Sequence, residues 1–286
     1  MVNVEIEYDE NNRLCSFIPK AVNQKIWRVF PDPKSDLIVL EIREKQEQKN
    51  ISQLLILDNY KKQIVAMAEM EATQTLLTFF DETILLSEID FQHEMPLAKG
   101  LKALNTDFET IWELEEVSYY GVIEEDNQNE PKVAFSLQSN YYSVPLKPNL
   151  EIEINTDKEQ IEVIEEEYYN LKSKVKQYFY STDEYLISHP NYKDISNFVF
   201  KKTNQNIQNS ILYTENESYL ICSYLVENEK QQNENYLLCT DKKGNLKTHF
   251  LISENIKKPQ EIILMKSKIL WIDGSRVFSK DINYSI

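Results

Sequence analysis

Glycine is scarce in this sequence, with 4 residues among 286. Nucleotide-binding folds need several glycines close together around a phosphate, so this scarcity disfavours them. Cysteine is as sparse: Cys15, Cys222 and Cys239 have no CxxC spacing, which argues against a disulfide framework and a zinc knuckle. Cys222 and Cys239 fall in neighbouring expected strands. The N-terminus nevertheless lacks the pattern of a signal peptide, so we expect a reduced, cytoplasmic protein.

Positive charge is also in deficit. Lys and Arg number 31 against 47 Asp and Glu, which gives a formal net charge of −16. An anionic surface repels phosphate backbones and anionic membranes, and no run of Lys and Arg interrupts the negative charge. No apolar run approaches the roughly 20 residues that span a bilayer. The sequence therefore predicts an acidic protein with neither a nucleic-acid nor a membrane partner.

The remaining composition is that of a globular protein, with 42% hydrophobic and 27% charged residues. Most of the chain consists of apolar stretches of four to eight residues, rich in Ile, Val, Leu, Tyr and Phe and separated by polar turns. This pattern predicts short strands. Six pairs of them predict tight hairpins: 26–30 with 37–42, 75–80 with 83–89, 119–123 with 132–137, 177–180 with 184–188, 210–214 with 219–225, and 261–265 with 269–272.

A second kind of hairpin follows the first at a nearly constant interval. Each has a polar turn of about six residues, and the turns begin at residues 58, 105, 155, 201 and 240, a spacing of about 45 residues. Four strands in each such period are typical of the blades of a β-propeller. We therefore predict an all-β chain whose residues 1–286 form a single propeller domain.

One of these hairpins carries a motif. The segment Gly100-Leu-Lys-Ala-Leu104 through Ile111-Trp112 resembles the blade motif of quinoprotein-like β-propellers. There a Gly opens the third strand, Ala-Leu-Asp/Asn ends it and a Trp closes the fourth. The whole chain resembles an uncharacterised bacterial domain family with degenerate propeller repeats. The resemblance implies the fold and brings no activity with it. Quinone dehydrogenases of this type are larger and exported, so no quinone cofactor is expected.

The two ends of the chain favour closure of a ring. Val4–Tyr8 and Leu14–Ile18 are spare strands, and the block after Trp271 supplies a third strand, which leaves the last blade one strand short. An N-terminal strand that completes the last blade would remove the exposed sheet edges at the join. We predict six blades, with seven as the alternative.

One segment does not follow the repeat. Ile161, Ile164, Tyr168 and Leu171 fall at helical spacing, which predicts a helix over 158–178. The repeat register instead predicts a strand at 160–164. Both readings stay open, with the segment as an insertion between blades.

The sequence contains no GxSxG, GxGxxG, GxxxxGK[ST] or HExxH motif, and we assign no catalytic residue. His93 and His189 each follow the second strand of an expected hairpin and are weak metal-ligand candidates. They would share a propeller face with Glu88, Asp90 and Asp273, although ordinary loop residues are the simpler reading. His249, inside an expected strand, is no better a candidate.

Aromatic residues are the other candidates for binding. Trp27, Trp112 and Trp271 lie in apolar strands, which predicts a position in the core between blades. The pairs Tyr119-Tyr120, Tyr141-Tyr142 and Tyr168-Tyr169 put one ring on each face of a strand, and an exposed Tyr suits a protein interface.

We therefore expect a non-catalytic propeller that binds or scaffolds another protein, without a metal or an organic cofactor. The alternative is a metal-dependent hydrolase or lyase with a polar site over the propeller axis. Metal content and the side chains at the centre of the ring would separate the two.

Overall fold

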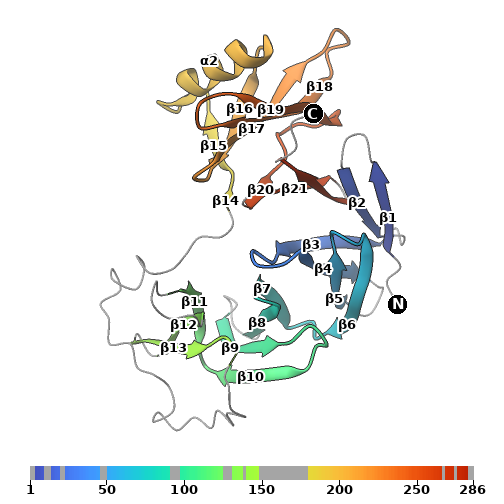
Figure 1. Cartoon of the computed structure of the whole chain (residues 1–286), viewed down its shortest axis with the longest axis vertical. Coiled ribbons are helices and arrows are strands. Elements are labelled where there is room, and N and C mark those ends of the chain that lie inside the picture. The colour runs from blue at the N-terminus through green and yellow to red at the C-terminus, as the bar shows by residue number, and fades with distance from the viewer. Residues whose placement is uncertain are drawn as a thin grey trace. The chain divides into compact units, whose positions relative to one another are not determined.

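The computed structural model describes residues 4–9, 14–19, 23–45, 50–90, 97–124, 131–137, 140–147, 180–265, 268–273 and 276–282. Within these ranges the chain is all-β apart from one helix, and its strand pairs are antiparallel (Figure 1). The chain divides into two compact units. One consists of residues 23–177, and the other combines residues 1–22 with residues 178–286.

The unit formed by residues 23–177 contains three described sheets, in each of which neighbouring strands follow one another along the chain. The first sheet is β3 (Gln24–Pro31), β4 (Leu37–Lys45), β5 (Asn50–Asp58) and β6 (Gln63–Met70). The second is β7 (Gln74–Phe80), β8 (Thr83–Asp90), β9 (Leu97–Leu104) and β10 (Thr110–Glu115). The third is β11 (Ser118–Ile123), β12 (Lys132–Leu137) and β13 (Asn140–Pro145).

The first strand of each of these sheets has the same irregularity. In its pairing with the second strand, the register shifts between Ile26 and Arg28, between Leu76 and Thr78, and between Tyr119 and Gly121. A bulge of this kind adds one residue to one strand and increases the local twist. Its recurrence shows that the repeat read from the sequence is also a repeat of backbone geometry.

The first and second sheets of this unit pack against each other through apolar side chains. Val39, Leu54 and Ile56 of the first sheet lie in one buried cluster with Leu76 and Phe79 of the second. Alternate residues of a strand point to opposite faces, so the near-continuous apolar runs of β4 and β5 indicate burial on both faces.

The second unit contains two described sheets. One has the order β15-β16-β17-β18-β19, and the other β1-β2-β22-β21-β20-β14. The first consists of β15 (Asp183–Leu186), β16 (Gln208–Glu215), β17 (Tyr219–Glu227), β18 (Asn233–Asp241) and β19 (Leu246–Glu254). The second consists of β1 (Val4–Asp9), β2 (Leu14–Pro19), β22 (Arg276–Asp281), β21 (Lys268–Asp273), β20 (Ile262–Met265) and β14 (Tyr180–Ser181).

The predicted pairing of the two chain ends is confirmed. Strand β2 pairs with β22, with Cys15 opposite Ser279 and Phe17 opposite Val277. Phe17 and Val277 are fully buried, so the pairing is held by core packing as well as by the backbone ladder.

Five of the six predicted tight hairpins are also present, as are the three hairpins with turns at 58, 105 and 240.

The sixth tight hairpin, 177–180 with 184–188, is wrong. Strand β14 pairs with β20, whereas β15 pairs with β16 in a different sheet. Thr182 lies between the two strands, and its hydroxyl oxygen accepts the N–H of Ile262 at 3.4 Å. The chain therefore passes from one sheet to the next at this residue instead of turning back.

The hairpin predicted around residue 201 is also wrong, because this segment is helix α2 (Tyr192–Thr203). Val199 is fully buried, and Tyr192 and Ile195 pack in the same cluster at helical spacing. The helix ends at Asn204, whose left-handed conformation (φ of 59°) is a common helix terminus. The polar residues 201–206, which the repeat predicts as a hairpin turn, instead contain the end of this helix.

Two predictions about the fold lie outside the described residues. They are the hairpin with its turn at 155 and the alternative of helix or strand over 158–178. The described residues form five sheets, and the number of blades stays a prediction.

Candidate functional site: a tryptophan held on a basic strand pair

Trp27 is not a core residue, which corrects the sequence prediction. Its side chain is 55% exposed. It is the extra residue in the β3 bulge, since Ile26 pairs with Ile42 and Arg28 pairs with Glu41. The bulge breaks the alternation of the strand, so Trp27 does not enter the core on either side.

The exposed indole is held in place by a chain of buried contacts. The guanidinium of Arg43 lies 4.8 Å from the centre of the Trp27 ring. Nε of Arg43 donates to Oε1 of Glu41 at 2.6 Å, and Nη2 forms an ion pair with the same oxygen at 2.6 Å. The Glu41 side chain is completely buried, and its Oε2 accepts the N–H of Leu76 at 2.9 Å and the Thr75 hydroxyl at 3.2 Å. Strand β7 of the next sheet therefore fixes Glu41, Glu41 fixes Arg43, and Arg43 supports Trp27.

Positive charges gather around this ring. Lys25 pairs with Arg43 across the two strands, and Arg28 pairs with Glu41. Paired residues share a face of the sheet, and so do residues two apart on one strand, which places Lys45 on this face as well. Lys25 and Lys45 are exposed, whereas Arg28 and Arg43 are partly buried. Arg28 donates to the carbonyl oxygen of Leu76 at 2.6 Å, so its position is also fixed.

The acidic neighbour on β4 does not neutralise this face. Glu44 lies opposite Gln24 and accepts its amide N–H at 3.0 Å. Adjacent residues of a strand point to opposite faces, so Glu44 lies on the other side of the sheet from Arg43 and Lys45. The face made by Lys25, Trp27, Arg28, Arg43 and Lys45 is called the Trp27 face below.

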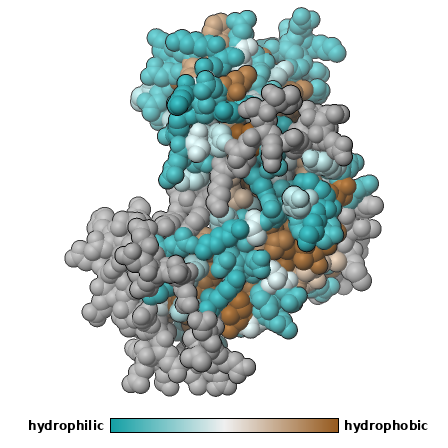
Figure 2. Space-filling model, in the orientation of Figure 1, coloured by the Kyte–Doolittle hydropathy of each residue, from teal (hydrophilic) through white to brown (hydrophobic). Residues whose placement is uncertain are grey.

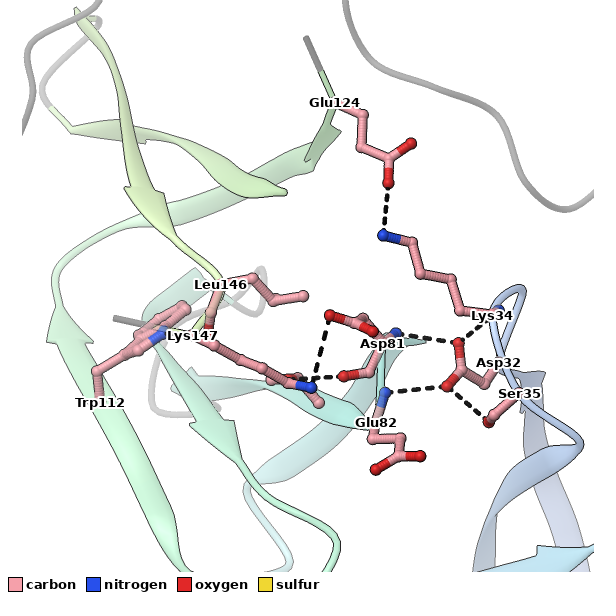
Figure 3. A network of polar contacts seen from close by, with 10 residues as sticks. Asp32, Lys34, Ser35, Asp81, Glu82, Trp112, Glu124, Leu146 and Lys147 are labelled. Carbon is pink, nitrogen blue, oxygen red and sulfur yellow. Dashed lines mark hydrogen bonds and ion pairs between the residues drawn. The ribbon is translucent and has the colours of Figure 1, made fainter. Parts of the chain in front are cut away.

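The other end of the same strand pair is held by a second buried carboxylate, Asp32 (Figure 3). Oδ1 accepts the N–H groups of Lys34 (2.9 Å) and Asp81 (3.0 Å), and Oδ2 accepts the Ser35 hydroxyl (2.8 Å) and the N–H of Glu82 (2.9 Å). Asp81 and Glu82 form the β7–β8 turn with positive φ, which is strained for residues other than glycine. Asp32 therefore ties its own loop to the turn of the next sheet.

The third sheet joins this network through ion pairs. Lys34 lies 2.7 Å from Glu124, and Lys147 lies 3.5 Å from Asp81. Both pairs are partly exposed and add little stability by themselves. Together with Asp32, they connect loops of all three sheets of this unit at one end (Figure 3).

Two of the sequence-predicted histidines are described. His189 is exposed. It was expected to follow the second strand of a hairpin, but β15 is an edge strand that, among the described residues, pairs only with the next strand, β16. Its Nδ1 accepts the N–H of Asn191 at 3.1 Å, and its ring packs edge-on against Tyr185 at 4.6 Å. These contacts organise the turn before α2. His93 lies outside the described residues.

His249 makes more contacts than His189. The Tyr224 hydroxyl lies 2.9 Å from His249 Nε2 and donates to Gln205 Oε1 at 2.8 Å. The imidazole stacks on Tyr236 at 5.4 Å between ring centres. Burial lowers the pKa of His249 and raises that of Tyr224, so both are held neutral. Gln205 follows α2, and the cluster therefore anchors the end of the helix to β17 and β19.

The other aromatic predictions divide as follows. Trp112 and Trp271 are each 2% exposed and belong to the core, as predicted. Trp112 Nε1 donates to the Leu146 carbonyl at 3.2 Å, and Trp271 stacks on Phe278 at 5.1 Å. The pair Tyr119-Tyr120 is only partly buried, as is Tyr141-Tyr142, while Tyr168-Tyr169 lies outside the described residues.

The carboxylates proposed near the axis are engaged in local contacts. Glu88 lies 3.6 Å from Lys99, and Asp273 accepts a hydrogen bond from Gln260 at 2.7 Å. Glu88 and Lys99 line a pocket of about 190 Å³ on the second sheet, beside Gly100. This volume is below the roughly 300–1,000 Å³ of pockets that enclose a drug-sized ligand.

The described part of the chain contains no group of three or more His, Cys, Asp and Glu side chains placed to hold a metal ion. No helix there has the length and apolarity to cross a bilayer. Cys15, Cys222 and Cys239 are buried and form no disulfide, and burial raises the pKa of Cys239 to about 12.

The Trp27 face was missed by sequence reasoning because its members come together only when β3 and β4 pair. The alternation Lys25-x-Trp27 was the one available signal, and it was obscured by the apolar residues around Trp27. Figure 2 shows one face on which hydrophilic residues predominate and hydrophobic residues form separate patches.

No family model and no curated protein matches this chain. Among solved structures, a crystal structure of Citrobacter koseri AztD is 7% identical, with 98% of this chain and 86% of that chain covered. Apo AztD from Citrobacter koseri is 8% identical, with 94% and 83% covered, and oligogalacturonate lyase in complex with manganese is 7% identical, with 98% and 96% covered. Each has a TM-score of 0.25, which carries no argument about fold or function.

Proposed function

We propose that this chain is a non-catalytic β-propeller that binds another protein, and that the Trp27 face is part of its binding surface. The recurring antiparallel sheets, the repeated bulge and the pairing of β2 with β22 support the propeller. Six blades in a closed ring remain part of the proposal.

The observation that carries the binding function is Trp27 itself. Trp27 is 55% exposed, and a partner that covers its apolar surface gains the free energy of removing that surface from water. Here the ring is also supported from behind by Arg43 and the buried Glu41. Such support holds the ring in one orientation before binding and lowers the entropy lost when a partner docks. Tryptophan and arginine are the residues that most often dominate the energy of protein interfaces.

Affinity capture from cells that express the protein natively tests the proposal. Trp27→Ala is expected to lose the specifically captured protein that the parent retains. Tyr60→Ala is the matched control, since Tyr60 is 79% exposed in the β5–β6 turn and no side-chain contact supports it among the described residues. Melting temperatures of both variants should equal that of the parent. A capture profile unchanged by Trp27→Ala would refute this binding surface.

Elemental analysis separates this proposal from the metal-dependent hydrolase or lyase. We expect protein purified without chelator to contain no stoichiometric transition metal. About one metal ion per chain, lost in His93→Ala or His189→Ala, would replace the binding proposal with the enzyme.

A further inference from the structure

The Trp27 face has the opposite charge to the protein as a whole. The chain carries a net charge of −16, yet Lys25, Arg28, Arg43 and Lys45 share one face of β3 and β4 with a single carboxylate, Glu41. Glu41 is fully buried and bonded to Arg43, so it offers no negative charge to solvent. An anionic ligand is therefore attracted to this face locally.

The groups of the face have different tasks. Arg43 and Arg28 are engaged by Glu41 and by the Leu76 carbonyl, and they form the support. Lys25 and Lys45 are exposed, and no ion pair of either is found among the described residues. Arg43 lies against the Trp27 ring, and Trp27 remains 55% exposed for contact with a ligand. The ligand must thus supply carboxylates for two ammonium groups and a flat or apolar group for one ring.

The spacing of these groups matches an extended peptide. Lys45 lies one two-residue step beyond Lys25 along the strand pair, which places their Cα atoms about 7–8 Å apart. Trp27 lies two residues from Lys25 in the other direction. Alternate residues of an extended chain repeat at about 6.7 Å and point to the same side. A peptide that runs along β3 therefore presents its first, third and fifth side chains to Lys45, Lys25 and Trp27.

We propose that the Trp27 face binds an acidic peptide segment with the pattern acidic-x-acidic-x-aromatic. The proposal rests on the binding function above and names its ligand class. The peptide binds through its side chains, because the bulge and Lys25 on the edge strand β3 oppose the addition of another strand. A long polyanion such as nucleic acid would also meet the acidic remainder of the surface, which repels it.

Fluorescence anisotropy with a labelled peptide tests this. The probe contains the sequence Glu-Ser-Glu-Ser-Tyr, and a second peptide, Glu-Glu-Ser-Ser-Tyr, has the same composition in another order. Against the full-length protein at low salt, we expect the first to bind at least about threefold more tightly than the second. Its affinity should fall steeply between 50 and 500 mM NaCl in the experiment, because exposed ion pairs are screened by salt.

Variants assign the binding to this face. Trp27→Ala and the double variant Lys25→Gln/Lys45→Gln should each raise the Kd of the first peptide by about tenfold or more. The control is Lys193→Gln/Lys201→Gln on helix α2, which removes the same charge from exposed positions in the other unit.

Three results would overturn the acidic-peptide assignment. They are an equal loss of affinity in the control pair, an unchanged Kd in Trp27→Ala, and tighter binding of a ten-residue oligothymidylate than of the peptide. If a protein is captured in a Trp27-dependent way while neither peptide binds, the binding function stands and the acidic ligand is wrong. If capture does not depend on Trp27, the proposed function itself has failed.

Discussion

Replacement of Asp32 should be among the most damaging single changes in the unit formed by residues 23–177. Its buried carboxylate accepts four hydrogen bonds, two from its own loop and two from the N–H groups of Asp81 and Glu82. A hydrogen bond to a charged group contributes about 1.5–3 kcal/mol, but water can reach part of these turns. We therefore expect Asp32→Ala to lower the free energy of unfolding by roughly 3–5 kcal/mol.

The Asn variant gives a sharper test, because an amide keeps only one acceptor. One oxygen of Asp32 serves Lys34 and Asp81, and the other serves Ser35 and Glu82. In Asp32→Asn one pair keeps its acceptor, and the other pair faces an NH₂ group. About half of the effect of the Ala variant should remain, roughly 1.5–3 kcal/mol.

Urea unfolding measures both changes. A Trp271→Phe background leaves Trp27 and Trp112 as the fluorophores, and both lie in the unit that contains Asp32. Asp107→Ala is the control, since Asp107 is exposed and its removal changes the charge equally, with an expected effect within about 0.5 kcal/mol. If Asp32→Ala and Asp32→Asn both behave like Asp107→Ala, the carboxylate does not join the two sheets and our reasoning is wrong.

Three further predictions follow from buried contacts. Trp112→Ala should lower the free energy of unfolding by roughly 3–5 kcal/mol. Trp112→Phe should lower it by clearly less, because Phe loses mainly the hydrogen bond to Leu146. Equal losses of the two variants in urea unfolding would contradict this. Gly100→Ala should cost about 1–3 kcal/mol, since a Cβ would meet a backbone carbonyl of β10 at 2.5 Å, and an unchanged melting temperature would argue against this close approach. Burial lowers the pKa of His249, so the unfolded chain binds a proton at this residue before the folded chain does, and stability should fall as pH drops below about 6.5. Between pH 7.5 and 5.5, His249→Gln should lose less melting temperature than the parent. An equal loss in both would contradict the assignment.

Local features could be predicted from the sequence. The hairpins with short polar turns, such as those at residues 58 and 105, are present because their strands are adjacent along the chain and their apolar pattern specifies which residues pair. The burial of Trp112 and the pairing of β2 with β22 also followed from patterns within single strands and from the number of strands. In these cases the nearest competing structure would expose apolar side chains or sheet edges.

Two of the errors concern short segments. The segment 192–203 has apolar residues that suit either a strand or a helix, and packing on the neighbouring sheet, with Val199 at its centre, decides for the helix. The segment 180–186 contains two strands that are too short to pair stably with each other. Each pairs instead with a longer strand of a different sheet, β14 with β20 and β15 with β16.

The sequence by itself therefore determined the all-β class, most of the hairpins, most of the core and the acidic character, because these depend on composition and on neighbours along the chain. Only the tertiary structure decided the Trp27 face. Trp27 reads as a core residue until the register of β3 against β4 places it in a bulge. Its support comes from Glu41 and Leu76, which lie in two different sheets. Cross-strand and cross-sheet distances are not contained in the spacing of residues along the chain, and for that reason the candidate site became visible only in the folded protein.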